Sequence, residues 1–149
     1  AAVAGPRRRR QVRPGVADLL VLDAEGLTKA AAGDRHVAAW LERAREVDAD
    51  ILVPAVTVAE VVRGGPGDAK VNRVIKASDV VVADDAMARS AGALLGRARS
   101  RATVDAFVAA TAAAAHSRLA ASRCFVLSSH PGDLEALLTD NPEVQVIHV

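Results

Sequence analysis

Three carboxylates stand out in the sequence because each is an isolated charge in, or at the end of, an apolar run. Asp23 ends the run Leu19–Leu22, Glu60 interrupts a Val/Ala-rich stretch, and Asp105 opens another. A carboxylate among apolar residues is costly to bury unless a positive partner meets it. Three on separate segments suggest a shared divalent cation, and oxygen-only ligands favour Mg²⁺ or Mn²⁺ over zinc. Such a cation polarises a phosphodiester and lowers the pKa of an attacking water, so these residues favour phosphodiester hydrolysis.

Each acid also has an ordinary structural interpretation. Asp23 suits a strand-end turn or a cap for the following helix. Asp105 lies in an expected first helical turn, where the helix dipole favours a carboxylate. Glu60 and Arg63, three residues apart, could form a surface pair. The apolar neighbours of Glu60 on both sides argue against a solvated face, so one shared cation is the simpler hypothesis for the three acids together.

Apolar runs alternate with segments of helical spacing along the chain. Strands are expected at 16–23, 50–54, 78–83, 124–127 and 144–149, and helices at 24–32, 36–47, 55–63, 68–77, 84–100, 104–119 and within 129–138. This alternation predicts an α/β fold with a mostly parallel sheet of four to five strands, covered by helices on both faces. Ligands of such sheets bind at the carboxyl ends of the strands, and Asp23 and the segment 128–130 are expected there.

The composition is that of one domain without covalent staples. The chain has 149 residues, 51% of them hydrophobic but only 2% aromatic, so the core must consist of Val, Leu and Ala. The net charge of +1 gives no global field for nucleic acid or membrane binding. The single Cys124, in an apolar run, is expected to be a buried structural thiol, which fits a reducing cytoplasm. No apolar run approaches the roughly 20 residues that a membrane span needs.

The basic charge is concentrated at the start of the chain. Arg7–Arg10 and Arg13 lie in a non-periodic segment rich in Pro, Gly and Arg. We expect residues 1–15 to form a flexible basic arm and residues 16–149 to form the folded domain. The arm is either a solvated tail or an electrostatic contact for RNA phosphates or an acidic partner.

Four segments resemble the ordered motifs of the PIN-domain ribonucleases. These are Leu22–Leu27, Pro54–Gly64, Thr103–Ala110 and Ser128–Leu134, and the resemblance spans residues 18 to 149 in order and with fitting spacing. The chain is most similar to the VapC-type toxins of bacterial toxin–antitoxin pairs. The resemblance implies a PIN-like three-layer α/β/α sandwich and a Mg²⁺-dependent endoribonuclease that cleaves RNA. It also implies a homodimer in the cytoplasm and inhibition by a cognate VapB-type antitoxin.

The resemblance also implies roles for single residues. Asp23, Glu60 and Asp105 match the acids that hold Mg²⁺ or Mn²⁺ in the family, and Asp133 is the remaining acid of the fourth motif. These four residues are therefore the expected catalytic and metal-binding set.

The fourth motif departs from the family pattern, which commonly reads Thr-x-Asp-x-x-Asp. Ser128 replaces the Thr and keeps a hydroxyl, whereas His130 replaces the first acid. Asp133 then takes the ligand role, or the site operates with one tightly bound metal, or activity is reduced. Arg63 either contacts RNA phosphate or supports Glu60. Ser128, His130 and Arg63 are thus auxiliary candidates.

Other functions remain open at this stage. A PIN-like module with weakened catalysis would act by binding RNA or the antitoxin. A phospho-acceptor domain would use Asp23, but it needs a late strand-end Lys and the chain has none after Lys76. A phosphatase with Asp23 as nucleophile would use a second acid two residues later, where Glu25 stands.

Overall fold

The computed structural model describes residues 18–119 and 123–149, and the expected basic arm lies outside the described residues. The strands are β1 (Leu19–Leu22), β2 (Asp50–Pro54), β3 (Asp79–Val81), β4 (Cys124–Ser128) and β5 (Val144–His148). The helices are α1 (Ala24–Ala32), α2 (Arg35–Glu46), α3 (Ala55–Val61), α4 (Ala69–Lys76), α5 (Asp85–Ala98), α6 (Thr103–Leu119) and α7 (Pro131–Leu137), with a 3₁₀ turn η1 at Pro66–Asp68.

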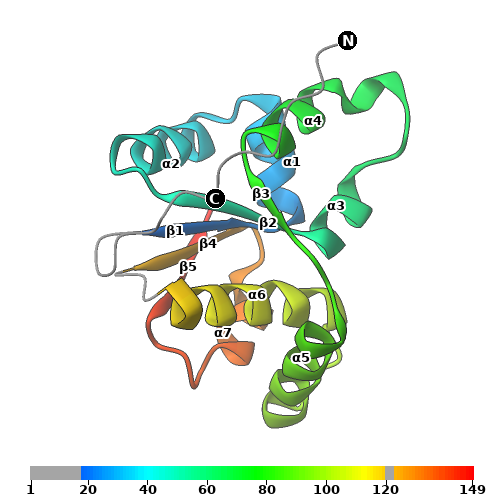
Figure 1. The fold of residues 1–149 in the computed structure, drawn as a ribbon, viewed down its shortest axis with the longest axis vertical. Helices are drawn as coiled ribbons and strands as arrows, with labels where there is room; N and C mark the ends of the chain where they lie inside the picture. Colours follow the sequence, from blue (N-terminus) through cyan, green and yellow to red (C-terminus); the bar gives the residue numbers. More distant parts are fainter. Residues whose placement is uncertain (1–17, 120–122) are drawn as a thin grey trace.

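The five strands form one parallel sheet in the order β3-β2-β1-β4-β5. Helices α1 to α4 lie on one side of the sheet and α5 to α7 on the other, which gives the three layers seen in Figure 1. The expected mostly parallel, doubly covered sheet is therefore confirmed. β1 is central, and its register with β4 sets Leu22 beside Leu127, so both strands end at the same edge.

β1 separates two apolar clusters. Leu19 and Val21 face the cluster built with α5, α6 and α7, whereas Leu20 and Leu22 face the cluster built with α1 and α2. All four residues are buried, as expected for a central parallel strand covered on both faces. The strand is thus a rigid support for the residue that follows it, Asp23.

Several element ends differ from the sequence expectation. α3 stops at Val61 because Val62 is extended and Gly64 adopts a left-handed conformation with a φ of 84°. α6 begins at Thr103 itself rather than being capped by it. The third strand contains only residues 79–81 instead of 78–83. The first strand is described only at 19–22 instead of 16–23, the other boundaries shift by one or two residues, and the order of elements is as expected.

Cys124 is a structural thiol, as expected. It is buried in β4, and its Sγ lies 3.9 Å from the carbonyl oxygen of Ala112. Burial raises the pKa of the thiol to about 12, so it stays protonated and unreactive at neutral pH.

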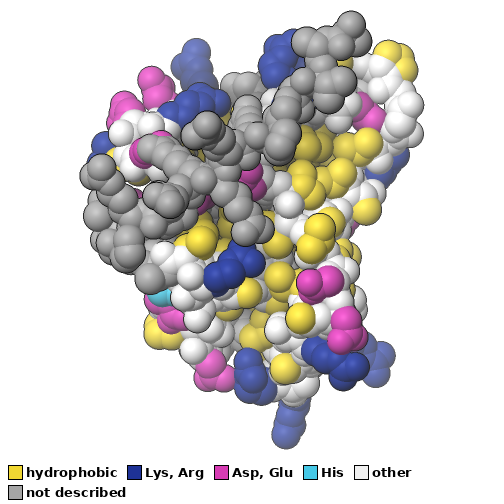
Figure 2. All heavy atoms as spheres, viewed as in Figure 1, with side chains coloured by type: hydrophobic (Ala, Val, Ile, Leu, Met, Phe, Trp, Pro, Cys, Tyr) yellow, Lys and Arg dark blue, Asp and Glu magenta, His cyan; other side chains and the backbone are white. Residues whose placement is uncertain are grey.

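The surface of the described part carries a few large apolar side chains. Val80, Val82 and Val104 are exposed, and Figure 2 shows hydrophobic side chains distributed among polar ones on the visible face. No helix within residues 18–119 and 123–149 is both long enough and apolar enough to cross a bilayer.

Candidate metal centre

Asp23 is fixed at the junction of β1 and α1. It is the N-cap of α1, and its Oδ1 accepts a hydrogen bond from the Gly26 N–H at 2.7 Å. Its side chain is buried, and this burial raises the pKa of the carboxyl, while the Gly26 and Ser128 hydrogen bonds act in the opposite direction. Asp23 therefore caps α1, as one interpretation of the sequence predicted. Capping does not remove the free-energy cost of burying the carboxylate charge.

Gly26 is essential to this junction because of its small size. A Cβ at Gly26 would lie 2.8 Å from the Leu127 carbonyl oxygen of β4. The backbone N–H of Asp23 points to the same carbonyl at 3.4 Å. The first turn of α1 thus packs directly on the end of β4, and that contact brings Asp23 to the fourth motif.

Ser128 joins the fourth motif to Asp23. It is buried at the end of β4, its hydroxyl donates to the Asp23 carboxylate, and its Oγ accepts the backbone N–H of His130 at 3.1 Å. The Ser128 hydroxyl therefore orders both the first acid and the turn that carries His130.

Glu60 is exposed on α3, which corrects the expectation that its apolar neighbours exclude a solvated face. The pKa of its carboxyl is nevertheless raised, first by partial desolvation and then by the negative charges of Asp105, Asp23 and Glu25. Three helices meet here, since α3 packs against both α1 and α6. Glu60 therefore lies in the same electrostatic neighbourhood as the other two acids.

Arg63 acts on the end of α3. Its guanidinium donates to the carbonyl oxygens of Ala59 and Val62, at 3.2 and 3.0 Å, and also to that of Glu60. Ala59 and Glu60 belong to the last turn of α3, whose carbonyl groups lack partners within the helix, and Val62 is the C-cap residue. Arg63 thus supports the backbone at Glu60, and its charge lowers the pKa of the Glu60 carboxyl.

Asp105 connects the cluster to α7. It is half-buried in the first turn of α6, and desolvation raises the pKa of its carboxyl, followed by the charges of Asp133 and Asp23. The charge of His130 acts in the opposite direction. Asp133 lies in the first turn of α7. Asp105 therefore stands between Asp23 and the fourth motif.

The structure brings all four predicted acids to one edge of the sheet, at the strand ends flanked by α3 and α6 in Figure 1. Within residues 18–119 and 123–149, however, no three His, Cys, Asp or Glu side chains are arranged to hold a metal ion as they stand. The donors are carboxylate oxygens whose charges repel one another, a set that fits a hard divalent cation. Metal binding would require the side chains to move closer together.

Three residues of this region have no role in the site expected from the sequence. Glu25 fits only the phosphatase alternative there, yet its charge raises the pKa of both Asp23 and Glu60. Gly26 was part of a motif but had no assigned role. Thr57 lies fully buried in α3, one turn before Glu60. A small residue three positions after Asp23 and a hydroxyl three positions before Glu60 were the available signals.

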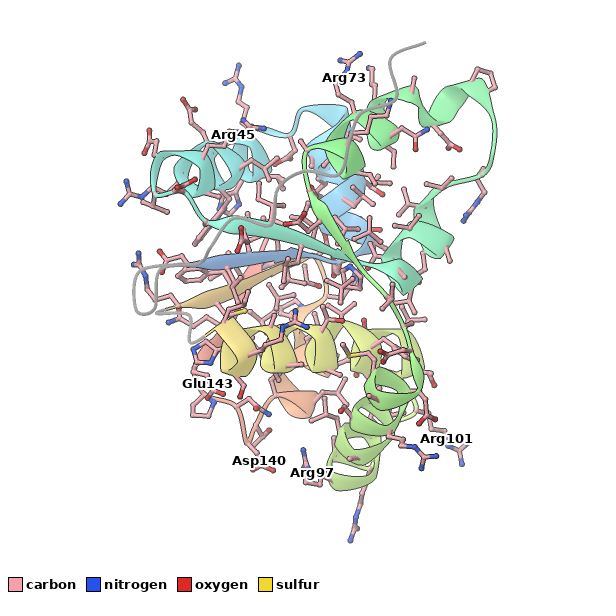
Figure 3. The ribbon with its side chains drawn as sticks, viewed as in Figure 1. Arg45, Arg73, Arg97, Arg101, Asp140 and Glu143 are labelled. Carbon is pink, nitrogen blue, oxygen red and sulfur yellow. The ribbon has the colours of Figure 1, made fainter. Side chains whose placement is uncertain are left out.

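Arginines labelled in Figure 3 lie on the outer surface instead of balancing the acids. Arg45 and Arg73 project from α2 and α4. Arg97, at the lower edge of the same view, pairs with Asp140 at an N–O distance of 3.3 Å. Among the described residues, the positive charges that act on Glu60 and Asp105 are those of Arg63 and His130.

A pocket of about 200 Å³ lies at the other end of the sheet. Its lining includes Asp18 and Arg123, which precede β1 and β4, together with Trp40 and Phe125. The two rings contact each other with centroids 5.0 Å apart. Trp40 therefore packs in the domain, and the pocket is separate from the acidic edge.

Comparison with known proteins identifies the fold. No family model matches the chain, and no curated protein matches its sequence. A chain in the crystal structure of VapBC2 from Rickettsia felis bound to a DNA fragment from its promoter superposes with a TM-score of 0.66 at 10% sequence identity. The match covers 88% of this chain and 98% of that chain. The chain therefore has the PIN-like α/β/α fold that the sequence motifs implied.

Proposed function

We propose that this protein is a Mg²⁺- or Mn²⁺-dependent endoribonuclease of the VapC type. The observation that carries the proposal is the gathering of four acids at one edge of a PIN-like sheet. Beside partial desolvation, the charges of Asp105 and Asp23 raise the pKa of Glu60, and those of Asp133 and Asp23 raise the pKa of Asp105. Mutual repulsion of this kind is relieved by a divalent cation. RNA is the substrate that the motif resemblance favours.

Each residue of the acidic edge has its own role in this proposal. A bound divalent cation lowers the pKa of water and stabilises negative charge on the phosphodiester. Asp23 is the one buried acid of the four, is held by Gly26 and Ser128, and would define the position of the site. Glu60 and Asp105 approach from the two helical layers. His130, whose charge acts on Asp105, is placed to orient a water or an RNA phosphate.

The first test uses two helix caps of the same type. Asp34 caps α2 through the Val37 N–H at 3.0 Å, just as Asp23 caps α1, but it lies at the start of a different helix. Asn caps helices about as well as Asp. We expect Asp23→Asn to lower Mn²⁺-dependent RNA cleavage at least 100-fold, whereas Asp34→Asn cleaves at the wild-type rate. Equal cleavage by both variants would refute the assignment of Asp23.

A second candidate function is a PIN-like module with weakened catalysis that acts by binding RNA or an antitoxin. The observation that favours it is His130, which stands near Asp105 where the family has an acid. We expect His130→Asp to increase Mn²⁺-dependent cleavage at least tenfold if the site is degraded. An unchanged rate, measured on the same RNA, would show that His130 does not limit the wild-type enzyme.

The proposed function includes partners. We infer that the protein is the toxin of a toxin–antitoxin pair, is inhibited by a VapB-type antitoxin and acts as a homodimer in the cytoplasm. The support is the likeness to a chain of a VapBC complex together with the motif resemblance. The product of an adjacent gene is the antitoxin to test, by its ability to block RNA cleavage.

A further inference from the structure

The pocket at the starts of β1 and β4 is lined by two of the three aromatic residues of this chain. The sequence has one Trp, two Phe and no Tyr, and both Trp40 and Phe125 line this pocket. Each ring is only half-buried, so part of it remains accessible to a ligand. The pocket volume is about 200 Å³. A cavity of about 150 Å³ in another protein holds one benzene ring, so this pocket has room for a single flat ring.

Arg123 is held at this pocket in a fixed orientation. Its Nε and Nη2 donate to the two carboxylate oxygens of the buried Asp18, at 3.3 and 2.6 Å. Its guanidinium carbon lies over the Phe125 ring, 5.7 Å from the ring centre. These contacts leave Nη1 available as a donor. A guanidinium that is already oriented loses little conformational freedom when it binds an anion.

Arg43 lines the same pocket from α2. Its Nη1 pairs with Glu46 at 3.2 Å, but both side chains are more than half exposed, at 64% and 57%. An exposed ion pair of this kind contributes little to stability, so it leaves Arg43 free to bind another anion. Asp18 is the one acid among the lining residues, and Arg123 already compensates its charge. The lining therefore carries a positive charge beside its aromatic rings.

The sequence adds positive charge near this end of the sheet. Arg7–Arg10 and Arg13 precede Asp18 by 5 to 11 residues along the chain. The two acids beside the lining residue Ala49 are Asp48 and Asp50, and both are engaged in interactions of their own. A ligand with negative charge is therefore favoured here over a cationic or neutral one.

An aromatic ring joined to an anionic group fits these features, and a nucleotide has both. The bases of single-stranded nucleic acids stack on aromatic side chains and on Arg planes, while neighbouring positive charges follow the phosphates. The nearby backbone is used by the sheet, since the Leu19 N–H donates to the Arg123 carbonyl oxygen at 2.8 Å. Stacking and charge, instead of hydrogen bonds to base edges, are thus the means of recognition.

We propose that this pocket is a second RNA-binding site, in which one base of a single-stranded RNA packs against Trp40 and Phe125 while a phosphate binds Arg43 and Arg123. The proposal takes RNA as the ligand from the function proposed above, but it uses none of the acids and no metal ion. The pocket lies at the opposite end of the sheet from Asp23, so it holds a part of the strand away from the acidic edge.

The first test uses the fact that Trp40 is the one Trp of the chain. In EDTA, which prevents metal-dependent cleavage, a short oligouridine is expected to change the Trp40 emission until the pocket is saturated. Uridine monophosphate should give the same change at higher concentration, because it carries one base and one phosphate. Inorganic phosphate should leave the emission unchanged. The proposal is refuted if oligouridine leaves the emission unchanged, or if inorganic phosphate changes it equally.

The second test compares two exposed arginines that each pair with an acid on their own helix. Arg43 pairs with Glu46 on α2, and Arg89 pairs with Asp85 on α5, in the other helical layer. We expect Arg43→Gln to weaken oligouridine binding at least threefold and to reduce the slope of log K against log salt by about 0.7, the value for one phosphate contact on a single strand. Arg89→Gln should match the wild type in both. Equal behaviour of the two variants would remove Arg43 from the site.

The ring itself is tested with Trp40→Leu, using the anisotropy of a labelled oligouridine. Loss of one stacking platform should weaken binding at least fivefold, while wild-type affinity would refute the role of the pocket. Thermal unfolding shows whether this variant is folded. If it is not, the comparison of Arg43→Gln with Arg89→Gln decides, because both changes are at exposed positions.

The outcomes separate this inference from the proposed function. If Asp23→Asn abolished RNA cleavage but oligouridine left the Trp40 emission of the wild type unchanged, the second site would fail alone. If oligouridine changed the emission but the protein cleaved no RNA with Mn²⁺, the pocket would stand as an RNA-binding site and the nuclease proposal would fail.

Discussion

At the scale of single residues, the helix caps Asp23 and Asp34 carry charges with opposite effects on the stability of the fold. Burial raises the pKa of Asp23, whereas the Val37 N–H, as the largest cause, lowers the pKa of Asp34. A raised carboxyl pKa means that folding favours the neutral form, and a lowered one means that folding favours the charged form. The charge of Asp23 thus destabilises the metal-free protein at neutral pH, and the charge of Asp34 stabilises it.

This difference predicts opposite stability changes in metal-free protein at pH 7. Asp23→Asn keeps the cap and removes a buried charge, so it should raise the free energy of unfolding by on the order of 1 kcal/mol. Asp34→Asn should lower it slightly. The gain from Asp23→Asn should shrink as the pH falls towards 3.8, the ordinary pKa of Asp, because the wild-type carboxyl becomes neutral.

Denaturation in EDTA at pH 7 and pH 4 measures both effects. The Asp34 contribution is present above pH 3.8 and is lost only below it, so its variant should show a similar deficit at both values. A destabilised Asp23→Asn at pH 7 would mean that capping and the Ser128 bond outweigh the cost of burial.

The identities of the acids could be predicted from the sequence, but their environments could not. Asp23 is buried as expected, because it ends a strand that is covered on both faces. Glu60 is exposed although its neighbours are apolar, because α3 lies at the margin of its layer and only Thr57 of that helix is buried. Which face of a short apolar helix is covered depends on packing that a single sequence does not reveal.

At the scale of elements, the contact between α1 and β4 determines where the first acid lies. Gly26 lets the helix approach the Leu127 carbonyl, and an added Cβ would lie 2.8 Å from that oxygen. The Leu127 carbonyl is a backbone group in β4, so it cannot move aside as the end of a flexible side chain could. We expect Gly26→Ala to destabilise the protein by about 1–3 kcal/mol, the usual cost of overpacking, and to weaken Mn²⁺ binding because Asp23 is displaced.

Gly96 of α5 provides the matched control. A Cβ there would meet no heavy atom within 4 Å, so Gly96→Ala should gain up to about 1 kcal/mol from helix propensity. Chemical denaturation followed by circular dichroism measures both variants. If Gly26→Ala were as stable as Gly96→Ala, the close approach of α1 to β4 would be wrong.

The sequence predicted the elements better than their ends. Strand and helix order follows from hydrophobic periodicity, which is local. The end of α3 depends instead on non-periodic contacts. The buried carboxylate of Asp68 accepts the N–H groups of Arg63 and Gly64 at 2.9 and 2.6 Å, and the Arg63 side chain covers the last carbonyls. These bonds end the helix before Arg63, whereas the apolar spacing alone predicts a helix that continues to residue 63.

At the scale of the whole molecule, the two ends of the parallel sheet carry different electrostatics. At the carboxyl ends of the strands, Glu60 and Asp105 each feel the repulsion of other acids. Asp18, which precedes β1 at the opposite end, accepts two hydrogen bonds from Arg123, at 2.6 and 3.3 Å. This pair joins the starts of the adjacent strands β1 and β4. One end therefore carries a stabilising ion pair, and the other carries the acids of the proposed metal site.

This division predicts that two Asp→Asn changes have separable effects. Asp18→Asn breaks the pair with Arg123 and should lower the Tm, while the Mn²⁺ Kd stays within about twofold of the wild type because the acidic edge is unchanged. Asp105→Asn removes one proposed ligand and should raise the Mn²⁺ Kd at least tenfold. The metal-free Tm should change little, since the lost repulsion offsets the lost charge at the start of α6.

Saturating Mn²⁺ extends the same comparison. A ligand at 100 times its Kd stabilises the folded state by about 2.7 kcal/mol, so Mn²⁺ should raise the Tm of Asp18→Asn as much as that of the wild type. At the same concentration it should raise the Tm of Asp105→Asn much less. Equal Mn²⁺ stabilisation of all three proteins would place the cation away from Asp105 and separate the metal site from the acidic edge of the sheet.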